Sequence, residues 1–201
     1  MKLIGSYTSP FVRKIRVILL EKGVEFDFVE ESPWEPGNRV SEYNPLGKVP
    51  ALVTPDGETF FDSPVLASYL EHAFPSPAMW PTDALGALRV RQLEALVDGT
   101  IDAAVAIRLE LQRPEALRVA DWLARQSAKV GRGLDALEAR AARQTWLAGD
   151  TMTLADISFG CLVFWLDFRA IHGDWRDGRP ALTRLAERLA ERDSFRQTPP
   201  V

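Results

Sequence analysis

The sequence predicts a two-part protein, in which a small α/β domain precedes an all-helical domain. Strand and helix signals alternate over the first 74 residues, whereas only helical patterns follow later in the chain. The segment 74–81 contains Pro75, Pro77 and Pro81, which break regular structure and indicate a linker. We therefore expect domains at 1–74 and 86–201, joined by a linker at 75–85.

The first strand, at residues 1–4, turns sharply into a helix that begins at Ser9-Pro10. Ser9 is suited to be the N-cap, because its hydroxyl can accept a hydrogen bond from a free N–H of the first turn. Pro10 fits the first helical position, where a missing N–H costs nothing. Apolar residues then recur at helical spacing up to Gly23, and the charged residues are expected on the opposite, solvated face.

The rest of the α/β domain is predicted as a second strand, a hairpin and a helix. Residues 26–29 form a strand parallel to the first through a βαβ crossover. The segments 51–54 and 58–61 flank a Pro-Asp-Gly turn, which is typical of a hairpin. Ser63-Pro64 has the same residue types as Ser9-Pro10, so we expect Ser63 to cap a helix over 65–72. This order predicts a compact mixed sheet with helices.

Helical patterns fill the second half of the chain. They predict helices over 84–112, from Pro114 to about 143, and over 180–192, with a short turn near 194. Thr153 and Asp156 have capping-box spacing, and the helix behind them is apolar nearly all round. We expect that helix to form the core of the second domain.

Composition excludes several classes of protein. A net charge of −4 and a pI near 5.3 argue against a general nucleic-acid binder. The single cysteine, Cys161, allows no intrachain disulfide, and His72 and His172 have no metal-ligand pattern, so no metal is expected. The longest apolar run, 157–166, is about half a membrane span. With no targeting pattern at either terminus, we expect a soluble cytoplasmic protein that binds no membrane.

Four segments occur in an informative order and spacing, and they are Ser9-Pro10-Phe11, Asn44 to Pro50, Asp62 to Leu70 and Trp146 to Ile157. They resemble motifs of the cytosolic glutathione transferase superfamily, and particularly of its bacterial YibF-like members. The resemblance covers essentially the whole chain. It implies a thioredoxin-like N-terminal domain that binds glutathione, a helical bundle that contributes the electrophile site, and a homodimer.

The resemblance also assigns the glutathione-binding residues. Val49-Pro50 matches the family's cis-proline, and the Val49 backbone pairs with the cysteinyl part of glutathione. Asp62 and Ser63 match the pair that holds the γ-glutamyl end, where a carboxylate suits an ammonium and a hydroxyl suits a carboxylate.

The contact to the glycine end of glutathione stays open at this point. Relatives often place a basic residue in the loop after strand two, whereas this loop contains Trp34-Glu35-Pro36. Lys48 or Arg39 can supply the positive charge, or the backbone near Pro36 can make the contact. In many relatives an acidic residue on the first long helix reaches across the dimer to the ammonium, and Asp98 is the candidate here.

The activity implied by the resemblance is attack of the glutathione thiolate on small electrophiles, as in detoxification. A free thiol with a pKa of about 8.5 is only a few per cent ionised at neutral pH. We predict that Ser9 lowers this pKa by donating to sulfur at a helix start, with Tyr7 as the alternative. Glutathione is then a co-substrate, and no permanently bound cofactor is expected.

Two other functions stay open on the sequence. Serine at the position of Ser9, where thiol-exchanging relatives have cysteine, argues against an enzyme thiol, but glutathione-dependent peroxidase or disulfide reductase activity is compatible with it. The same fold also serves in non-catalytic binding or regulatory proteins.

Overall fold

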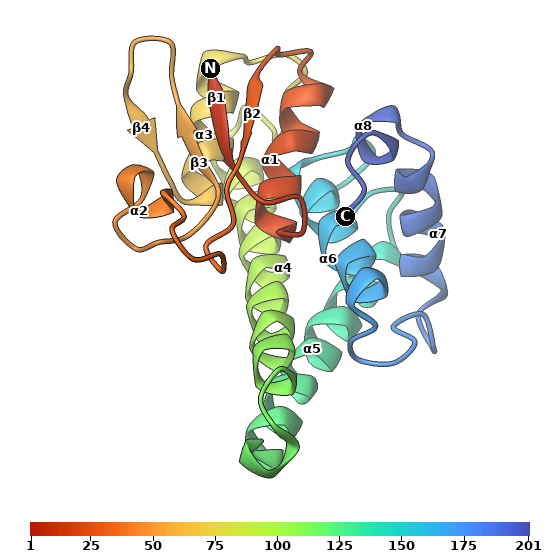
Figure 1. The fold of residues 1–201 in the computed structure, drawn as a ribbon. Coiled ribbons are helices and arrows are strands. Elements are labelled where there is room, and N and C mark those ends of the chain that lie inside the picture. Colours follow the sequence, from red (N-terminus) through yellow and green to blue (C-terminus); the bar gives the residue numbers. More distant parts are fainter. The chain divides into compact units, whose positions relative to one another are not determined.

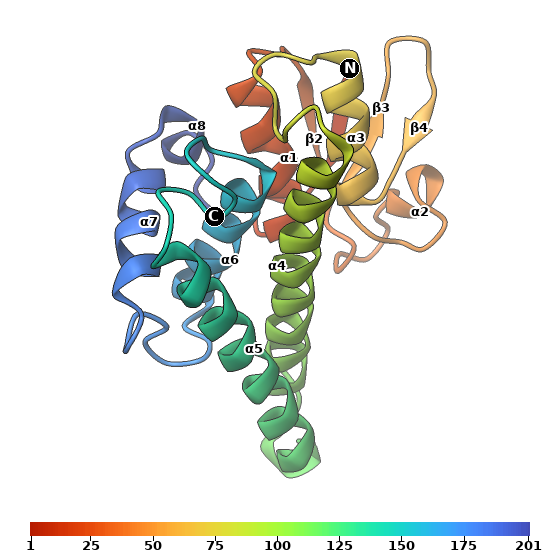
Figure 2. The ribbon, with the colours of Figure 1, turned by 180° about the vertical axis from the view of Figure 1, so that it is seen from behind.

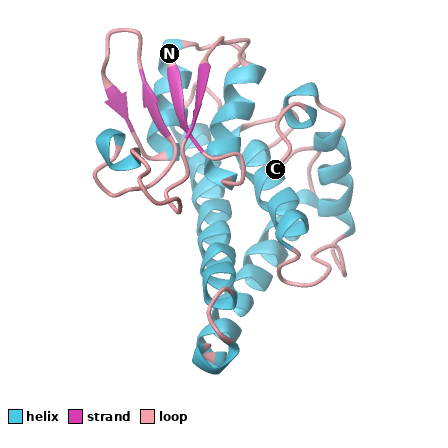
Figure 3. Cartoon of the chain, in the orientation of Figure 1, coloured by secondary structure: helices cyan, strands magenta, loops and turns pink.

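The computed structural model describes residues 1–201, which fall into two compact units. The first unit comprises Met1–Met79 together with Arg192–Val201, and the second comprises Trp80–Glu191. All four strands belong to the first unit, and the second is helical (Figure 3). The predicted fold class, an α/β domain followed by an all-α domain, is confirmed.

The sheet of the first unit consists of β1 (Lys2–Gly5), β2 (Asp27–Glu30), β3 (Ala51–Val53) and β4 (Thr59–Phe60). Its strand order is β2-β1-β3-β4. Strands β1 and β2 are parallel, whereas β3 is antiparallel to both β1 and β4. The predicted crossover and hairpin are therefore both present.

The helices of the first unit are α1 (Pro10–Glu21), α2 (Val40–Tyr43), α3 (Ser63–Ala73) and α8 (Asp193–Arg196). Helices α1 and α3 lie side by side on one face of the sheet (Figures 1 and 2). Their apolar faces meet the sheet in a fully buried core that positions the starts of both helices. Its members include Leu3, Ile4, Ile15, Ile18, Leu52, Leu66 and Leu70.

The expectation that the charged side chains of α1 and its C-cap are solvated is wrong for three of them, namely Arg13, Lys14 and Lys22. Arg13 is only 5% exposed and donates to the carbonyl of Phe195 over 3.2 Å. Lys22, which caps the C-terminus of α1, donates to the Glu71 carboxylate over 2.7 Å and to the carbonyl of Phe74 over 2.6 Å. Different parts of the chain cover Arg13 and Lys22, since the segment near Phe195 covers Arg13 and the end of α3 with the segment after it surrounds the ammonium group of Lys22.

The last ten residues pack with the first unit, whereas the expected boundary put them in the helical domain. The guanidinium of Arg192 forms an ion pair with Glu21 at the end of α1, and Ser194 donates to the same carboxylate. Burial raises the pKa of Glu21, but the hydrogen bonds from Arg192 and Ser194 outweigh it, and the net pKa is lowered. This ion pair holds α8 on α1.

The second unit contains α4 (Ala84–Leu111), α5 (Ala120–Ala141), α6 (Leu154–Arg169) and α7 (Pro180–Ala190). Helix α4 packs against α5 and α6, and α7 packs against α5 and α6. None of the helices has the length and apolar composition needed to span a membrane.

The helix predicted to begin at Pro114 begins later. Pro114 precedes a single 3₁₀ turn, η1 (Glu115–Leu117), and α5 starts only at Ala120. The Glu110 carboxylate accepts a hydrogen bond from the N–H of Val119 over 2.8 Å. A side chain at the end of α4 thus satisfies the backbone N–H of Val119, the residue before α5. This contact lies between the 3₁₀ turn and the helix.

The core helix α6 and its predicted capping box are confirmed. The buried Asp156 carboxylate accepts from the N–H and hydroxyl of Thr153 at 2.8 and 2.9 Å, and from the N–H of Leu147 at 2.8 Å. Burial raises the pKa of Asp156 more than these hydrogen bonds lower it. The hydrogen bonds to Asp156 also attach the segment before α6 to the start of the helix.

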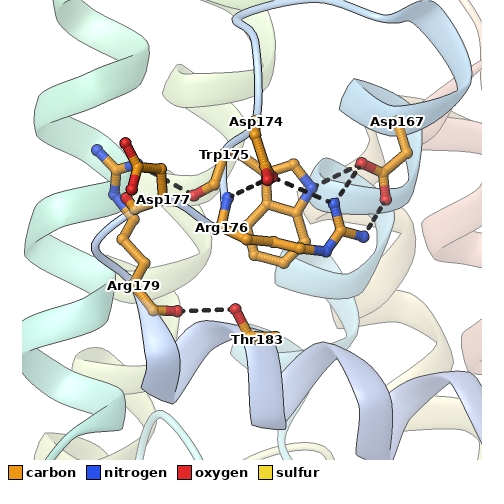
Figure 4. A network of polar contacts seen from close by, with 7 residues as sticks. All are labelled: Asp167, Asp174, Trp175, Arg176, Asp177, Arg179 and Thr183. Atoms are coloured by element: carbon orange, nitrogen blue, oxygen red, sulfur yellow. Dashed lines mark hydrogen bonds and ion pairs between the residues drawn. The ribbon is translucent and has the colours of Figure 1, made fainter.

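A polar network joins the end of α6 to the loop before α7 (Figure 4). The Asp167 carboxylate accepts from the guanidinium of Arg176 at 2.9 and 2.7 Å and from the indole N–H of Trp175 at 2.8 Å. Arg179 reaches from the start of α7 to the carbonyl of Trp175 and to Asp135 on α5. Both oxygens of Asp167 are thus engaged within this loop.

Candidate functional site

Ser9 is the N-cap of α1, as predicted. Its hydroxyl oxygen accepts a hydrogen bond from the N–H of Val12 over 3.3 Å, and Pro10 is the first helical residue. This bond uses an oxygen lone pair and leaves the O–H proton able to donate elsewhere. The half-exposed Ser9 therefore presents a donor at a helix start that contains no acidic residue in its first turn.

Tyr7, the alternative activating residue, is held in an aromatic cluster. Its ring contacts that of Phe28, with centroids 4.6 Å apart. The Arg16 guanidinium lies over both rings, 4.7 Å from the centroid of Tyr7 and 5.2 Å from that of Phe28. Burial lowers the pKa of Arg16, against the opposing effect of Tyr7. These contacts give Tyr7 a packing role.

The segment before β3 presents the backbone of Val49. The Val49–Pro50 bond is cis, as the resemblance predicted. Pairing of β3 begins at Ala51, so the N–H and C=O of Val49 lie outside the sheet ladder. Buried Asn44 shapes the preceding loop, because its amide donates to the carbonyl of Lys48 over 2.9 Å and its oxygen accepts from the N–H of Leu46 over 3.0 Å.

The start of α3 differs from the prediction. The N-cap is Asp62, whose carboxylate accepts from the N–H of Ser63 over 2.6 Å, and the helix spans Ser63–Ala73. Ser63 is therefore the first helical residue, and the prediction that it caps the helix is wrong. Its hydroxyl is buried, with the residue 0% exposed, and has no hydrogen-bond partner. Aspartate is as good an N-cap as serine, so the Asp-Ser-Pro order was the available signal.

The two basic candidates for the glycine end of glutathione differ in their surroundings. The exposed guanidinium of Arg39 is bound to Glu42 over 2.6 to 3.1 Å, and these hydrogen bonds raise the pKa of Arg39. Lys48 is exposed and forms no ion pair. Pro36 is also exposed, in the loop before α2. Of the two cations, Lys48 is thus the one available to a ligand.

The remaining candidate, Asp98, lies within α4 of the second unit. Its role across a dimer stays a prediction.

One further feature, at the start of α3, had no signal in the sequence. The Phe61–Asp62 peptide bond is cis.

Comparison with known proteins identifies the protein family to which the chain belongs. Residues 8–73 match the model of the glutathione S-transferase N-terminal domain, and residues 120–188 match that of the C-terminal domain. The Escherichia coli (strain K12) protein named "Uncharacterized GST-like protein YibF" is 49% identical over 200 residues, which is 100% of this chain and 98% of its own. The maleylacetoacetate isomerase of Pseudomonas aeruginosa is 32% identical, covering 100% of this chain and 96% of its own.

A solved structure agrees over the full length. The crystal structure of a glutathione S-transferase from Methylobacillus flagellatus with glutathione bound has a TM-score of 0.95 and 40% identity, covering 100% of this chain and 99% of its own. The fold thus defines a two-domain protein with a thioredoxin-like N-terminal unit. The chain belongs to the glutathione S-transferase family.

Proposed function

We propose that this protein is a glutathione transferase that binds glutathione on its first unit and activates the thiol for attack on small electrophiles. The observation that carries the proposal is the Ser63 hydroxyl, which is buried at the start of α3 without a hydrogen-bond partner. A buried polar group of this kind is costly unless it is satisfied, and a helix start favours an anionic partner. The carboxylate of a γ-glutamyl group supplies such a partner.

The remaining contacts to the γ-glutamyl and cysteinyl parts follow from groups that stay available. Asp62 uses one carboxylate oxygen for capping, which leaves the other for an ammonium group. The N–H and C=O of Val49, beside Pro50, can pair with an extended peptide in the manner of an added strand. Lys48, with the backbone near Pro36, is then assigned to the glycine carboxylate.

Ser9 is assigned the thiol-activating role. Lowering a thiol pKa by about 2 units requires about 2.7 kcal/mol of preferential thiolate stabilisation. A charge-assisted hydrogen bond supplies about 1.5–3 kcal/mol, and a helix start adds about 0.3–1 kcal/mol. A donor hydroxyl at the start of α1 therefore provides stabilisation of the required size.

The proposal includes the assembly and location of the protein. The exposed apolar side chains of Leu85 and Leu88, at the start of α4, offer a surface that a second copy can cover in a homodimer. The only cysteine, Cys161, is buried in α6, which suits a reducing cytoplasm. Conjugation there would serve detoxification.

Calorimetry with glutathione, followed by a conjugation assay with chlorodinitrobenzene, tests the proposed function. We expect saturable binding and glutathione-dependent formation of the thioether. Absence of binding at millimolar glutathione would contradict the proposal and favour a regulatory role for the fold. Binding with turnover of hydroperoxides or mixed disulfides, but of no electrophile, would replace transfer by reduction.

A further inference from the structure

Two arginines, on two helices of the second unit, line one cavity. Helices α4 and α5 pack against each other and run in opposite directions from their shared end at η1, so the start of α4 and the end of α5 lie away from that end (Figure 2). A cavity of about 520 Å³ lies between these parts of the two helices, within the range of about 300–1,000 Å³ that is usual for small-molecule sites. Arg89, in the second turn of α4, and Arg140, in the last turn of α5, both line it.

The lining of this cavity has an excess of positive charge. Neither guanidinium forms an ion pair or a hydrogen bond within the protein. A second cavity of about 280 Å³ adjoins the first, since Arg140 and Gln144 line both, and it adds the guanidinium of Arg143, which is also unpaired. The only carboxylate in the two linings is that of Asp83, and one of its oxygens accepts from the N–H of Gly86 over 2.7 Å. Three guanidinium groups and one carboxylate thus line the two cavities.

The wall formed by residues 144–148 is held in place by the rest of the second unit. The guanidinium of Arg188 on α7 donates to the carbonyl of Thr145. The N–H of Leu147 donates to the buried Asp156 carboxylate over 2.8 Å. Two other helices thus fix this wall of the cavity before any ligand binds.

The wall at the start of α4 is packed closely. An added Cβ at Gly86 would lie 2.5 Å from the Asp83 carboxylate and 2.9 Å from the side chain of Pro81, so this turn has no room for a side chain there. Leu93, which is only 6% exposed, and Ala148 add apolar surface to the lining. Because contacts within the protein already define both walls, binding costs little reordering of the backbone.

Guanidinium groups bind phosphate through paired N–H donors, and a phosphate monoester carries a charge of about −1.5 to −2 at neutral pH. Such a group matches two or three arginines better than a carboxylate with a single charge does. We propose that Arg89 and Arg140, with Arg143 and the Gln144 amide, bind the phosphate group of a small phosphorylated molecule, whose organic part lies against the apolar lining. This inference does not rest on the proposed function, because its site lies wholly on the second unit.

Calorimetry at constant ionic strength with inorganic phosphate, glycerol 3-phosphate, glycerol and acetate tests the site. We expect saturable binding of both phosphates at one site per chain, acetate binding at least about tenfold weaker, and no binding of glycerol. Arg89→Gln and Arg140→Gln should each weaken phosphate binding about tenfold, because a charge-assisted hydrogen bond is lost. Arg132→Gln is the matched control, since Arg132 is exposed on α5 and lines neither cavity. It should change phosphate binding by less than about twofold.

A change at Asp83 tests the charge of the site in the opposite direction. Asp83→Asn keeps a good helix cap but removes the only negative charge from the lining. Phosphate binding should become about 2–5-fold tighter, which a merely structural role of the arginines does not predict. A thermal melt of each variant checks that it folds.

The absence of saturable phosphate binding at millimolar concentration would overturn the inference. Equal binding of phosphate and acetate would do the same, as would an equal loss in Arg132→Gln and Arg140→Gln, which would indicate a general effect of surface charge. Glutathione binding should be the same in Arg140→Gln and in the wild type. A failure of the wild type to bind glutathione would therefore overturn the proposed function and not this inference.

Discussion

The two Ser-Pro helix starts of the first unit share their residue types but differ in what the serine does. At α1, Ser9 stands outside the helix and its hydroxyl caps the N–H of Val12. At α3, Asp62 takes the capping position and moves Ser63 into the helix, where its hydroxyl has no partner. The Ser9 hydroxyl is thus used as a cap and can also donate a hydrogen bond, whereas the Ser63 hydroxyl is left for a ligand.

The difference shows that a cap motif has to be read together with the residue before it. Both serines precede a proline, and proline is tolerated at the first or the second helical position. An aspartate before Ser63 competes for the cap, whereas Thr8 does not displace Ser9. We assign Ser9 to the sulfur and Ser63 to the γ-glutamyl carboxylate on this basis.

The largest effect is expected from Ser9→Gly. Glycine keeps most of the capping, to within a few tenths of a kcal/mol, but removes the hydroxyl. Turnover of chlorodinitrobenzene at saturating glutathione should fall about 10–100-fold, because a hydrogen bond to the thiolate is lost. Steady-state kinetics with a thermal melt measure this, and Ser9→Thr is the control that retains a hydroxyl. Unchanged turnover would leave Ser9 as a cap alone.

Ser63→Ala should weaken glutathione binding about tenfold, because the carboxylate of the ligand loses a buried donor. Calorimetry with each variant gives the Kd. The matched change at the other helix start, Ser9→Ala, should alter Kd much less than it alters turnover. An unchanged Kd in Ser63→Ala would remove the main support for the proposed ligand.

Asp62→Asn should reduce glutathione affinity about 2–5-fold, which is the size expected for an exposed ion pair. Asparagine caps as well as aspartate, so the stability of the protein should not change. Asp62→Ala, by contrast, should lower both affinity and stability. If Asp62→Asn binds glutathione as the wild type does, the ammonium contact lies elsewhere. The salt dependence of Kd checks the ionic origin of the effect.

The smallest effect concerns stability alone. Ser9→Ala should lower the free energy of unfolding by about 1 kcal/mol, because a cap is lost. Ser63→Ala should leave it unchanged or raise it, because the hydroxyl makes no hydrogen bond in the free protein. Denaturant unfolding of the two variants without glutathione measures the difference. Equal destabilisation would mean that the two hydroxyls have the same structural role.

Local patterns predicted those features that neighbouring residues determine. The Ser9 cap, the hairpin around Gly57 and the box of Thr153 and Asp156 each depend on a few adjacent residues, and all are present. The cis Val49–Pro50 bond was predicted from the family resemblance. The residues alone would not have indicated it, because only about 5–6% of X-Pro bonds in folded proteins are cis.

The features that sequence reasoning missed depend on distant parts of the chain. Arg13 is buried because residues near Phe195 return to cover it, and Lys22 is buried because the segment after α3 surrounds its ammonium group. The late start of α5 depends on a contact from Glu110, nine residues before Val119. No local periodicity encodes these contacts.

The most direct test of the central claim is a spectroscopic titration of the thiol of glutathione bound to the wild-type protein and to Ser9→Gly. Our account predicts a thiol pKa well below the value of about 8.5 for a free thiol in the wild type, and a return toward that value in the variant. A pKa that is unshifted in the wild type, or equally lowered in both proteins, would contradict the assignment of Ser9 as the residue that stabilises the thiolate.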